Sequence, residues 1–325
     1  MIDIQLFNSF YKGSIIKKIT IVTPCFNEED NINKCYLETK KIFDQIYNYN
    51  YEHLFIDNAS VDSTFEILNK IAKNDKKIKI IRNSRNFGWV RSPYYGLLQA
   101  DGDGVVMLAA DLQDPVDVIP RLIEQWELGG KSIVAVKKNS KESKTMFLIR
   151  SLYYKIANSL SDVDFIEHFT GFGLYDKKVI DILRSIKDPY PFFRGMIAEI
   201  GLEIRCVEYV QPKRLNGKKK SNFYLLYDVG MLGIVSHSKV PLRIATMAGL
   251  MFSVISLFSA IVFFMLKLVF WNTFTIGIAP IIIGLFFLFS ILLFSIGIVG
   301  EYVGFLYEKI QNKPLVIERN RVNFD

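Results

Sequence analysis

The chain has 325 residues, and 50% of them are hydrophobic although 22% are charged, so the apolar residues must be concentrated in particular segments. The formal net charge of +7 favours a partner that carries phosphate, whether a nucleotide, a nucleic acid or an anionic lipid. The three cysteines, Cys25, Cys35 and Cys206, fit neither a disulfide framework nor a Cys-x-x-Cys metal site, and residues 1–18 lack the apolar core of a signal peptide.

Short apolar segments alternate with helical patterns through the first half of the chain. β-Branched and apolar runs predict strands at 18–24, 53–57, 78–82, 105–110 and 132–136. Apolar residues at helical spacing predict the helices between them, at 28–46, 62–73, 91–100 and 115–128. Because strands that alternate with helices form right-handed βαβ units, the sequence predicts an α/β fold with a mostly parallel sheet.

Polar residues follow three of these strands at the point where each strand ends. They are Asn27 and Glu28 after the first strand, Asp57 at the end of the second, and Asp111, Gln113 and Asp114 after the fourth. Ligands of parallel sheets bind at the carboxyl ends of the strands, so we expect these residues to share one site.

Local structure offers a second interpretation of some of these residues. Helix capping explains Ser60 and Asp62, and residues 111–115 taken alone would fit a turn followed by a helix with proline in its first turn. Capping does not explain Asp57, a carboxylate directly at the end of an apolar strand. We therefore expect Asp57 to have a role in binding.

These residue types suit an enzyme that uses a nucleotide sugar. The diphosphate leaving group gains negative charge as the glycosidic bond breaks, and a divalent cation held by carboxylate and amide oxygens offsets that charge. We expect Asp111 and Gln113 to hold Mg²⁺ or Mn²⁺, and Asp57 to accept hydrogen bonds from the N–H groups of uracil or guanine. Asp111 and Asp114 are the candidate catalytic residues.

Basic and amphipathic segments precede the C-terminal part of the chain. A basic loop runs from Arg214 to Lys220. It either contacts substrate phosphates or is only attracted to anionic headgroups, an attraction worth about 1 kcal/mol per basic residue. Residues 222–235 predict an amphipathic helix in the membrane interface. Residues 146–160 are a second candidate, for which ordinary core packing is the alternative.

Two uncharged apolar stretches, 244–266 and 274–300, are each long enough to cross a bilayer, which takes about 20 residues. A helical hairpin buried in a soluble core is the alternative. The loop between them is short, so both flanks lie on one side, and the excess of lysine and arginine in the flanks predicts that both termini are cytoplasmic. Small residues in both stretches would permit close helix packing and therefore a homo-oligomer.

The predicted organisation is therefore a catalytic domain over 1–221, an interfacial helix over 222–241, two transmembrane helices over 242–300 and a cytoplasmic tail over 301–325. The expected location is the inner (cytoplasmic) membrane.

Several motifs in this order resemble the family-two inverting glycosyltransferases of the GT-A fold. They are TPCFNEE, IDNASVDST, RNSRNFG, AADLQDP and FTGFGLYDKK, followed by the two apolar helices. The polyprenyl-phosphate branch, which includes dolichol-phosphate mannose synthase and bactoprenol glucosyltransferases, is the most similar. The resemblance implies transfer of a hexose from a UDP- or GDP-sugar to undecaprenyl phosphate, with no nucleic-acid partner.

The same resemblance assigns residues to subsites. It places Pro24, Phe26, Asn27, Glu28 and Asp57 around the nucleoside and Asp111 and Gln113 at the metal. It also implies that Arg150, Arg214 and Lys220 bind substrate or acceptor phosphate.

Two positions depart from the family pattern. Ala109 stands where the family often has the first aspartate of Asp-x-Asp, and Gly171 stands where related enzymes have an aspartate proposed as base. A phosphate acceptor is largely ionised near pH 7 and needs little help from a base. Glu167 and His168 are adjacent candidates for that role. The alternatives are transfer to another lipid or glycan acceptor, and a membrane scaffold that has lost activity.

Overall fold

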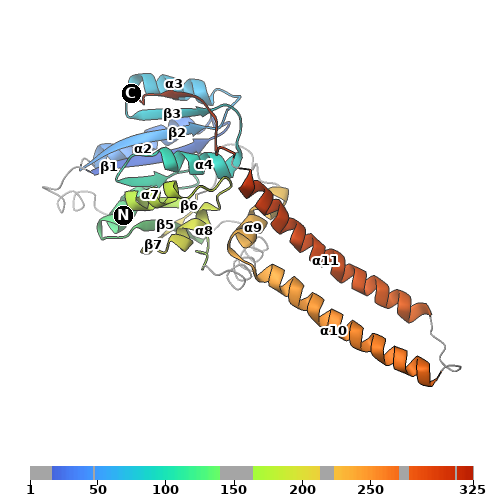
Figure 1. Cartoon of the computed structure of the whole chain (residues 1–325). Coiled ribbons are helices and arrows are strands. Elements are labelled where there is room, and N and C mark those ends of the chain that lie inside the picture. Colours follow the sequence, from blue (N-terminus) through green and yellow to red (C-terminus); the bar gives the residue numbers. More distant parts are fainter. Residues whose placement is uncertain are drawn as a thin grey trace.

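Eight strands form one sheet at the centre of the structure, a computed structural model that describes residues 17–46, 48–139, 164–212, 223–270, 278–311 and 313–324. Within these ranges the strand order is β7-β5-β6-β4-β1-β2-β3-β8 (Figure 1). The strands are β1 (Lys17–Cys25), β2 (Tyr49–Asp57), β3 (Ile78–Asn83), β4 (Gly104–Met107), β5 (Ser132–Asn139), β6 (Phe169–Asp176), β7 (Ile204–Val210) and β8 (Glu318–Val322).

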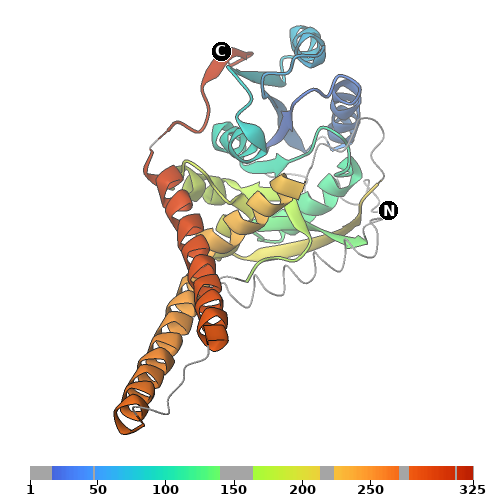
Figure 2. The same cartoon turned by 90° about the vertical axis from the view of Figure 1, so that its right-hand side faces the viewer.

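Helices cover both faces of this sheet and extend beyond it (Figures 1 and 2). The helices of the α/β domain are α2 (Ile32–Gln45), α3 (Thr64–Asn74), α4 (Gly88–Gln99), the 3-10 turn η1 (Val116–Val118), α5 (Ile119–Glu127), α7 (Lys177–Ser185) and α8 (Phe193–Ile200). Three further helices follow, α9 (Phe223–His237), α10 (Val240–Val269) and α11 (Ile278–Ile310).

The strands that begin the chain are parallel, which aligns their carboxyl ends. β1 pairs in parallel with β2 and β4, and β2 pairs in parallel with β3, so that Cys25 lies opposite Asp57 and Asp57 opposite Arg82. β6 is antiparallel to β4 and β5, and β8 is antiparallel to β3. The predicted α/β fold is confirmed, and the sheet is mixed because β6 and β8 run against their neighbours.

Alternating side chains of the strands divide the core between the two faces. On β4, Val106 packs with α2 and α5 on one face, whereas Val105 and Met107 pack with α4, α7 and α8 on the other. Gly96 allows α4 to approach the sheet closely, because a Cβ atom there would lie 2.6 Å from Cγ1 of Ile56. This close contact fixes α4 above the ends of β1 and β2.

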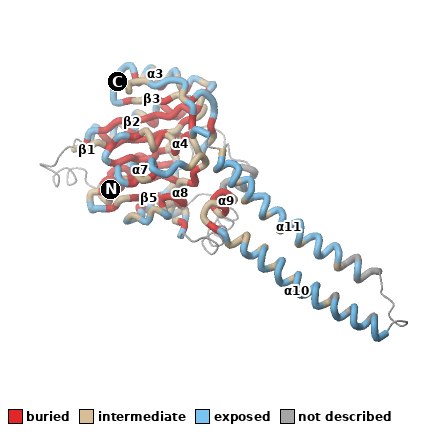
Figure 3. Tube along the Cα trace, in the orientation of Figure 1, coloured by how far each residue is buried: buried red, intermediate tan, exposed pale blue. Residues whose placement is uncertain are grey.

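α10 and α11 extend away from the domain as a pair, and their described side chains are largely exposed along their length (Figure 3). Both are long and apolar enough to cross a membrane, with mean hydropathy of 2.4 over Val240–Leu266 and 2.1 over Gly284–Ile310. None of either window is buried. The alternative of a hairpin buried in a soluble core therefore does not fit the structure.

The chain segments on both sides of this helical pair are attached to the α/β domain. Before α10, His237 of α9 lies against the rings of Phe165 and Phe192. After α11, β8 joins the edge of the sheet beside β3. Here the structure differs from the predicted division of the chain, because α11 continues to Ile310 and part of the predicted tail is a strand of the domain.

Candidate active site

The loops that follow β1 and β2 are joined by hydrogen bonds between backbone and side chains. The N–H of Asn27 donates to Oγ of Ser60 at 3.0 Å, and Oδ1 of Asn27 accepts from the N–H of Val61 at 2.9 Å. The N–H of Glu28 donates to Oγ1 of Thr64 at 2.8 Å. Asn27 has φ +53°, a left-handed conformation that asparagine tolerates. These bonds hold the turn after β1 in one conformation.

Of Ser60 and Asp62, the two residues expected to cap the helix that follows β2, only Asp62 bonds to the start of that helix. Oδ1 of Asp62 accepts from the N–H of Thr64, the first residue of α3, at 3.0 Å. The hydroxyl of Ser60 instead accepts from Asn27, so Ser60 links two loops rather than capping the helix.

Asp57 is fully buried at the end of β2, and its two oxygens differ. Oδ1 accepts from the N–H of Ser60 at 3.0 Å. Oδ2 lies 3.3 Å from Nε of Arg82, but neither of these two buried atoms makes a hydrogen bond. Burial raises the pKa of Asp57, an effect that the bonds from Ser60 and the charge of Arg82 only partly offset. Oδ2 is therefore a buried oxygen that pairs with Arg82 and accepts no hydrogen bond in this structure.

Three asparagines that sequence reasoning did not single out hold the wall beside Asp57. Nδ2 of Asn83 donates to Oδ1 of Asn58 at 2.9 Å, and Nδ2 of Asn58 donates to Oδ1 of Asn86 at 2.8 Å. Oδ1 of Asn58 also accepts from the N–H of Phe87. Asn83 and Asn86 belong to the RNSRNFG segment, so its asparagine content was the available signal.

The acidic turn after β4 contains Asp111, Gln113 and Asp114. Leu112 has φ +57°, which turns the chain sharply, and Oδ1 of Asp111 accepts from the N–H of Gln113 at 3.2 Å. Asp114 is buried, and its oxygens accept from the hydroxyl of Tyr209 and the N–H of Ala109. Burial raises the pKa of Asp114 to about 6.

The donor set of this turn fits a magnesium or manganese ion that also binds phosphate. Asp111 and Gln113 are partly exposed and supply one carboxylate and one amide oxygen; the latter accepts from Gln211 at 3.2 Å. Mg²⁺ needs only one or two protein oxygens when phosphates and water complete its shell. Among the described residues, no group of three or more His, Cys, Asp or Glu side chains forms a fuller metal site.

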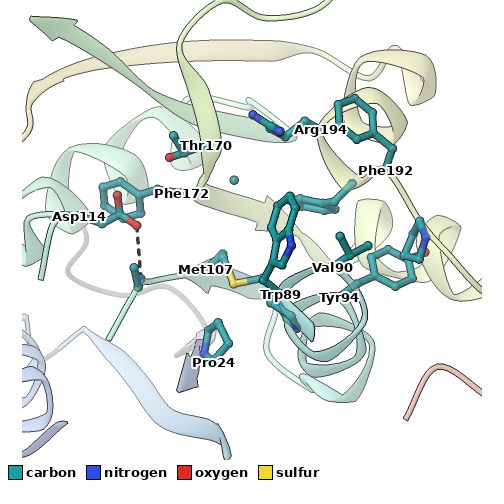
Figure 4. A pocket seen from close by; sticks show the side chains of 15 residues that line it. Pro24, Trp89, Val90, Tyr94, Met107, Asp114, Thr170, Phe172, Phe192 and Arg194 are labelled. Atoms are coloured by element: carbon teal, nitrogen blue, oxygen red, sulfur yellow. Dashed lines mark hydrogen bonds between the residues drawn. The ribbon is translucent and has the colours of Figure 1, made fainter. Parts of the chain in front are cut away.

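A cavity of about 180 Å³ lies across the ends of β1, β4 and β6 (Figure 4). Its lining comes from the ends of β1 and β4, the start of α4, β6 and the start of α8. The residues are Pro24, Trp89, Val90, Pro93, Tyr94, Met107, Ala109, Asp114, Thr170, Gly171, Phe172, Pro191, Phe192, Phe193 and Arg194. Most of these side chains are apolar, and the only ionisable carboxyl and guanidinium groups among them are Asp114 and Arg194.

Both departures from the family pattern face this one cavity. Ala109 and Gly171 line it from β4 and β6. Gly171 has φ +107°, and a Cβ atom added there would meet Cδ1 of Phe193 at 3.8 Å, so the position has space for a side chain but a backbone that favours glycine. Glu167 and His168 are not among the lining residues.

The structure places the predicted nucleotide-binding and metal-binding residues at one edge of the sheet, but it does not describe the predicted phosphate-binding residues. Pro24, Phe26, Asn27, Glu28, Asp57, Asp111, Gln113 and Asp114 all lie at the carboxyl ends of β1, β2 and β4. Arg150, Arg214 and Lys220 lie outside the described residues, as do residues 146–160. Sequence reasoning missed the aromatic wall of the cavity and Arg194.

Known proteins resemble this chain over most of its length. An uncharacterized glycosyltransferase of Bacillus subtilis, YkcC, is 34% identical over 300 residues, which are 92% of this chain and 92% of that protein. The SfII prophage-derived bactoprenol glucosyl transferase of Shigella flexneri is 33% identical over 301 residues, 92% of this chain and 97% of that protein.

Among solved structures, glucosyl-3-phosphoglycerate synthase from Mycobacterium tuberculosis, in complex with Mn²⁺, UDP and glucosyl-3-phosphoglycerate, overlaps with a TM-score of 0.48. It is 18% identical and covers 72% of this chain and 82% of its own. The family described as Glycosyl transferase family 2 matches residues 20–183. The chain therefore belongs to glycosyl transferase family 2 and is a glycosyltransferase.

Proposed function

We propose that this enzyme transfers a hexose from UDP-hexose to a polyprenyl phosphate at the cytoplasmic face of the membrane, with a divalent cation and with inversion at the anomeric carbon. The relatives named bactoprenol glucosyl transferase support a polyprenyl acceptor. One observation carries the proposal. A polar site at the ends of β1 and β2 and a mostly apolar cavity meet at the acidic turn after β4, in a domain attached to two long apolar helices.

Asp57 supports uracil over guanine as the base. Guanine presents two adjacent N–H donors that suit a carboxylate with both oxygens available, whereas uracil presents one N–H between two carbonyl oxygens. Oδ1 of Asp57 already accepts from Ser60, whereas Oδ2 accepts no hydrogen bond and lies beside Arg82, an asymmetry that suits the single N–H of uracil. The guanidinium of Arg82, held at 4.0 Å over the ring of Phe65, would donate to a carbonyl oxygen of uracil.

Asp111 and Gln113 would hold the cation, which offsets the charge that develops on the departing UDP. One oxygen of the acceptor phosphate forms a bond to the anomeric carbon as the bond from that carbon to UDP breaks. The phosphate is largely ionised at pH 7, so no proton must be removed from it. Such a reaction would not need a carboxylate at position 171, where this chain has glycine and the related pattern has aspartate.

The attachment of both helix ends supports the proposed topology. α9 precedes α10 and contacts the α/β domain, and β8 follows α11 and pairs with the sheet of the same domain. The hairpin would therefore enter and leave the membrane on the same side. The basic residues that flank it favour the cytoplasm for that side. They include Lys239, Arg243, Lys309, Lys313, Arg319 and Arg321.

The test is transfer by the full-length protein, purified in detergent and given undecaprenyl phosphate, Mg²⁺ or Mn²⁺, and a panel of UDP- and GDP-sugars. We expect a glycolipid from a UDP-hexose, and none when EDTA replaces the cation. Binding of nucleotide sugars without transfer to any lipid phosphate would instead favour a membrane scaffold. Transfer to a different acceptor would favour the alternative enzyme.

A further inference from the structure

Arg194 is the second residue of α8 and, among the residues that the structure describes, the only arginine or lysine that lines the apolar cavity. In Figure 4 it lies near Thr170 and Phe192, on the side of the cavity opposite Pro24. In the sheet, β6 and β1 are on opposite sides of β4. Arg194 therefore lies on the β6 side of the acidic turn, across the shared cavity from Pro24.

The hydrogen-bonding capacity of Arg194 is almost unused. Its Nη1 donates one long bond of 3.4 Å to the carbonyl oxygen of Phe169, and its guanidinium lies 5.2 Å from the ring centre of Phe192. No carboxylate among the described residues forms an ion pair with it. By contrast, Arg184 and Arg205 each donate to a carboxylate and to backbone oxygens.

A partly buried guanidinium has lost some of its hydration and carries five N–H donors, so it binds an anion strongly. Most of the cavity wall is apolar: Trp89, Phe192 and Phe193 offer no acceptor for the hydroxyls of a sugar or a nucleoside. Among the described side chains of the lining, the acceptors are confined to Asp114, Thr170 and Tyr94. A ligand that fits both features has a phosphate joined directly to a hydrocarbon.

The wall that contains Arg194 is also connected to the membrane helices. Lys309 of α11 forms an ion pair with Asp188, six residues before Arg194 in the chain. Phe192 packs against His237 at the end of α9, with 5.8 Å between ring centres. A hydrocarbon chain that enters from the membrane side would therefore meet this wall.

We propose that Arg194 binds the phosphate of the acceptor lipid, and that Trp89, Phe192 and Phe193 enclose the hydrocarbon adjoining that phosphate. This inference rests on the proposed function. It adds Arg194 to the phosphate-binding residues that the family resemblance implies, which are Arg150, Arg214 and Lys220. It also places the acceptor on the β6 side of the metal site.

Binding of a short lipid phosphate tests the proposal on the full-length protein in detergent. The probes are farnesyl phosphate, farnesol and UDP with Mg²⁺, titrated against wild type, Arg194→Gln, Arg194→Lys and the control Arg121→Gln. Arg121 is an exposed residue of α5 that donates to the backbone oxygen of Glu208, away from the cavity. Thermal unfolding of each variant checks that it is folded.

We expect Arg194→Gln to weaken farnesyl phosphate binding by about 10- to 100-fold, the effect of a lost charge-assisted bond. Farnesol and UDP should bind as in wild type, Arg194→Lys should restore part of the affinity, and Arg121→Gln should have no effect. In the transfer assay, KM for the lipid should rise while KM for the nucleotide sugar stays constant.

Three outcomes would overturn the proposal: unchanged farnesyl phosphate binding, an equal loss of farnesol binding, or a loss confined to UDP. A wild type that binds farnesyl phosphate through Arg194 but transfers no sugar would contradict the proposed function alone. The two failures are thus distinguishable.

Discussion

The two sides of the acidic turn differ in how they are built. On the side of β2 and β3, short segments supply polar groups that hydrogen-bond to one another, as in the chain from Asn83 through Asn58 to Asn86. Toward β6, the cavity at this turn is lined mainly by apolar and aromatic residues of β6 and α8, and residues of α4 and the end of β1 complete its wall. A rigid polar site suits recognition of a nucleotide, whereas an apolar cavity suits a lipid.

The largest effect should come from the turn that both sides share. Asp111→Asn should lower kcat by about 10³-fold, because the cation loses its charged ligand. UDP binding should lose its dependence on Mg²⁺ in a titration. Asp117→Asn, at an exposed position in η1, is the control. If Asp111→Asn keeps wild-type activity and metal dependence, the metal is not held by this turn.

A smaller effect, confined to the nucleotide side, should follow from Asp57→Asn. An amide presents a donor as well as an acceptor, so the bond to the base is weakened, and KM for the nucleotide sugar should rise about 10- to 100-fold. KM for the lipid phosphate should not change, and exposed Asp44→Asn should match wild type. A rise in both KM values would mean that the two sides are not separate.

Gly171→Asp should affect the cavity side alone. The added carboxylate would face the acceptor phosphate, and like charges placed together should raise KM for the lipid by about tenfold. The backbone at φ +107° should also lower the unfolding temperature, at a cost of about 1–3 kcal/mol. Gly171→Ala has the same strain without the charge. If both variants raise the lipid KM equally, the effect is steric and the phosphate is not near.

The smallest effect concerns stability and involves His53, which is fully buried beside Phe55 and 2.8 Å from Oγ1 of Thr23. Burial lowers the pKa of His53 to about 3. Between about pH 6.5 and 3 the unfolded chain binds a proton at this residue and the folded chain does not. The free energy of unfolding should therefore fall by about 1.4 kcal/mol per pH unit in this window as pH decreases.

His53→Gln should remove that part of the pH dependence. Unfolding temperatures of wild type and variant, measured at pH 7.5 and 5.0, give the comparison. Because His237 also has a lowered pKa, only the difference between the two proteins reports on His53. An identical loss of stability in both would show that His53 is not kept neutral by the fold.

The contrast between the two sides also explains which features the sequence could predict. The motifs after β1, β2 and β4 are local, and parallel pairing brings their ends together, so Asp57 and Asp111 could be placed from sequence. The cavity joins Trp89, Phe172 and Arg194, which come from three separate elements between positions 89 and 194 and follow no shared pattern. Strands β6, β7 and β8 were missed because their apolar alternation is interrupted, by glycines in β6 and by charged residues in β7 and β8.

The position of β8 has a consequence for the order in which the protein forms. β8 is synthesised after both long apolar helices, yet it pairs with β3, which is synthesised before both helices. Until then β3 presents an unpaired edge, the kind of edge that recruits other chains. Completion of the sheet therefore waits for the apolar hairpin to be made, so folding of the α/β domain is coupled to synthesis of the hairpin.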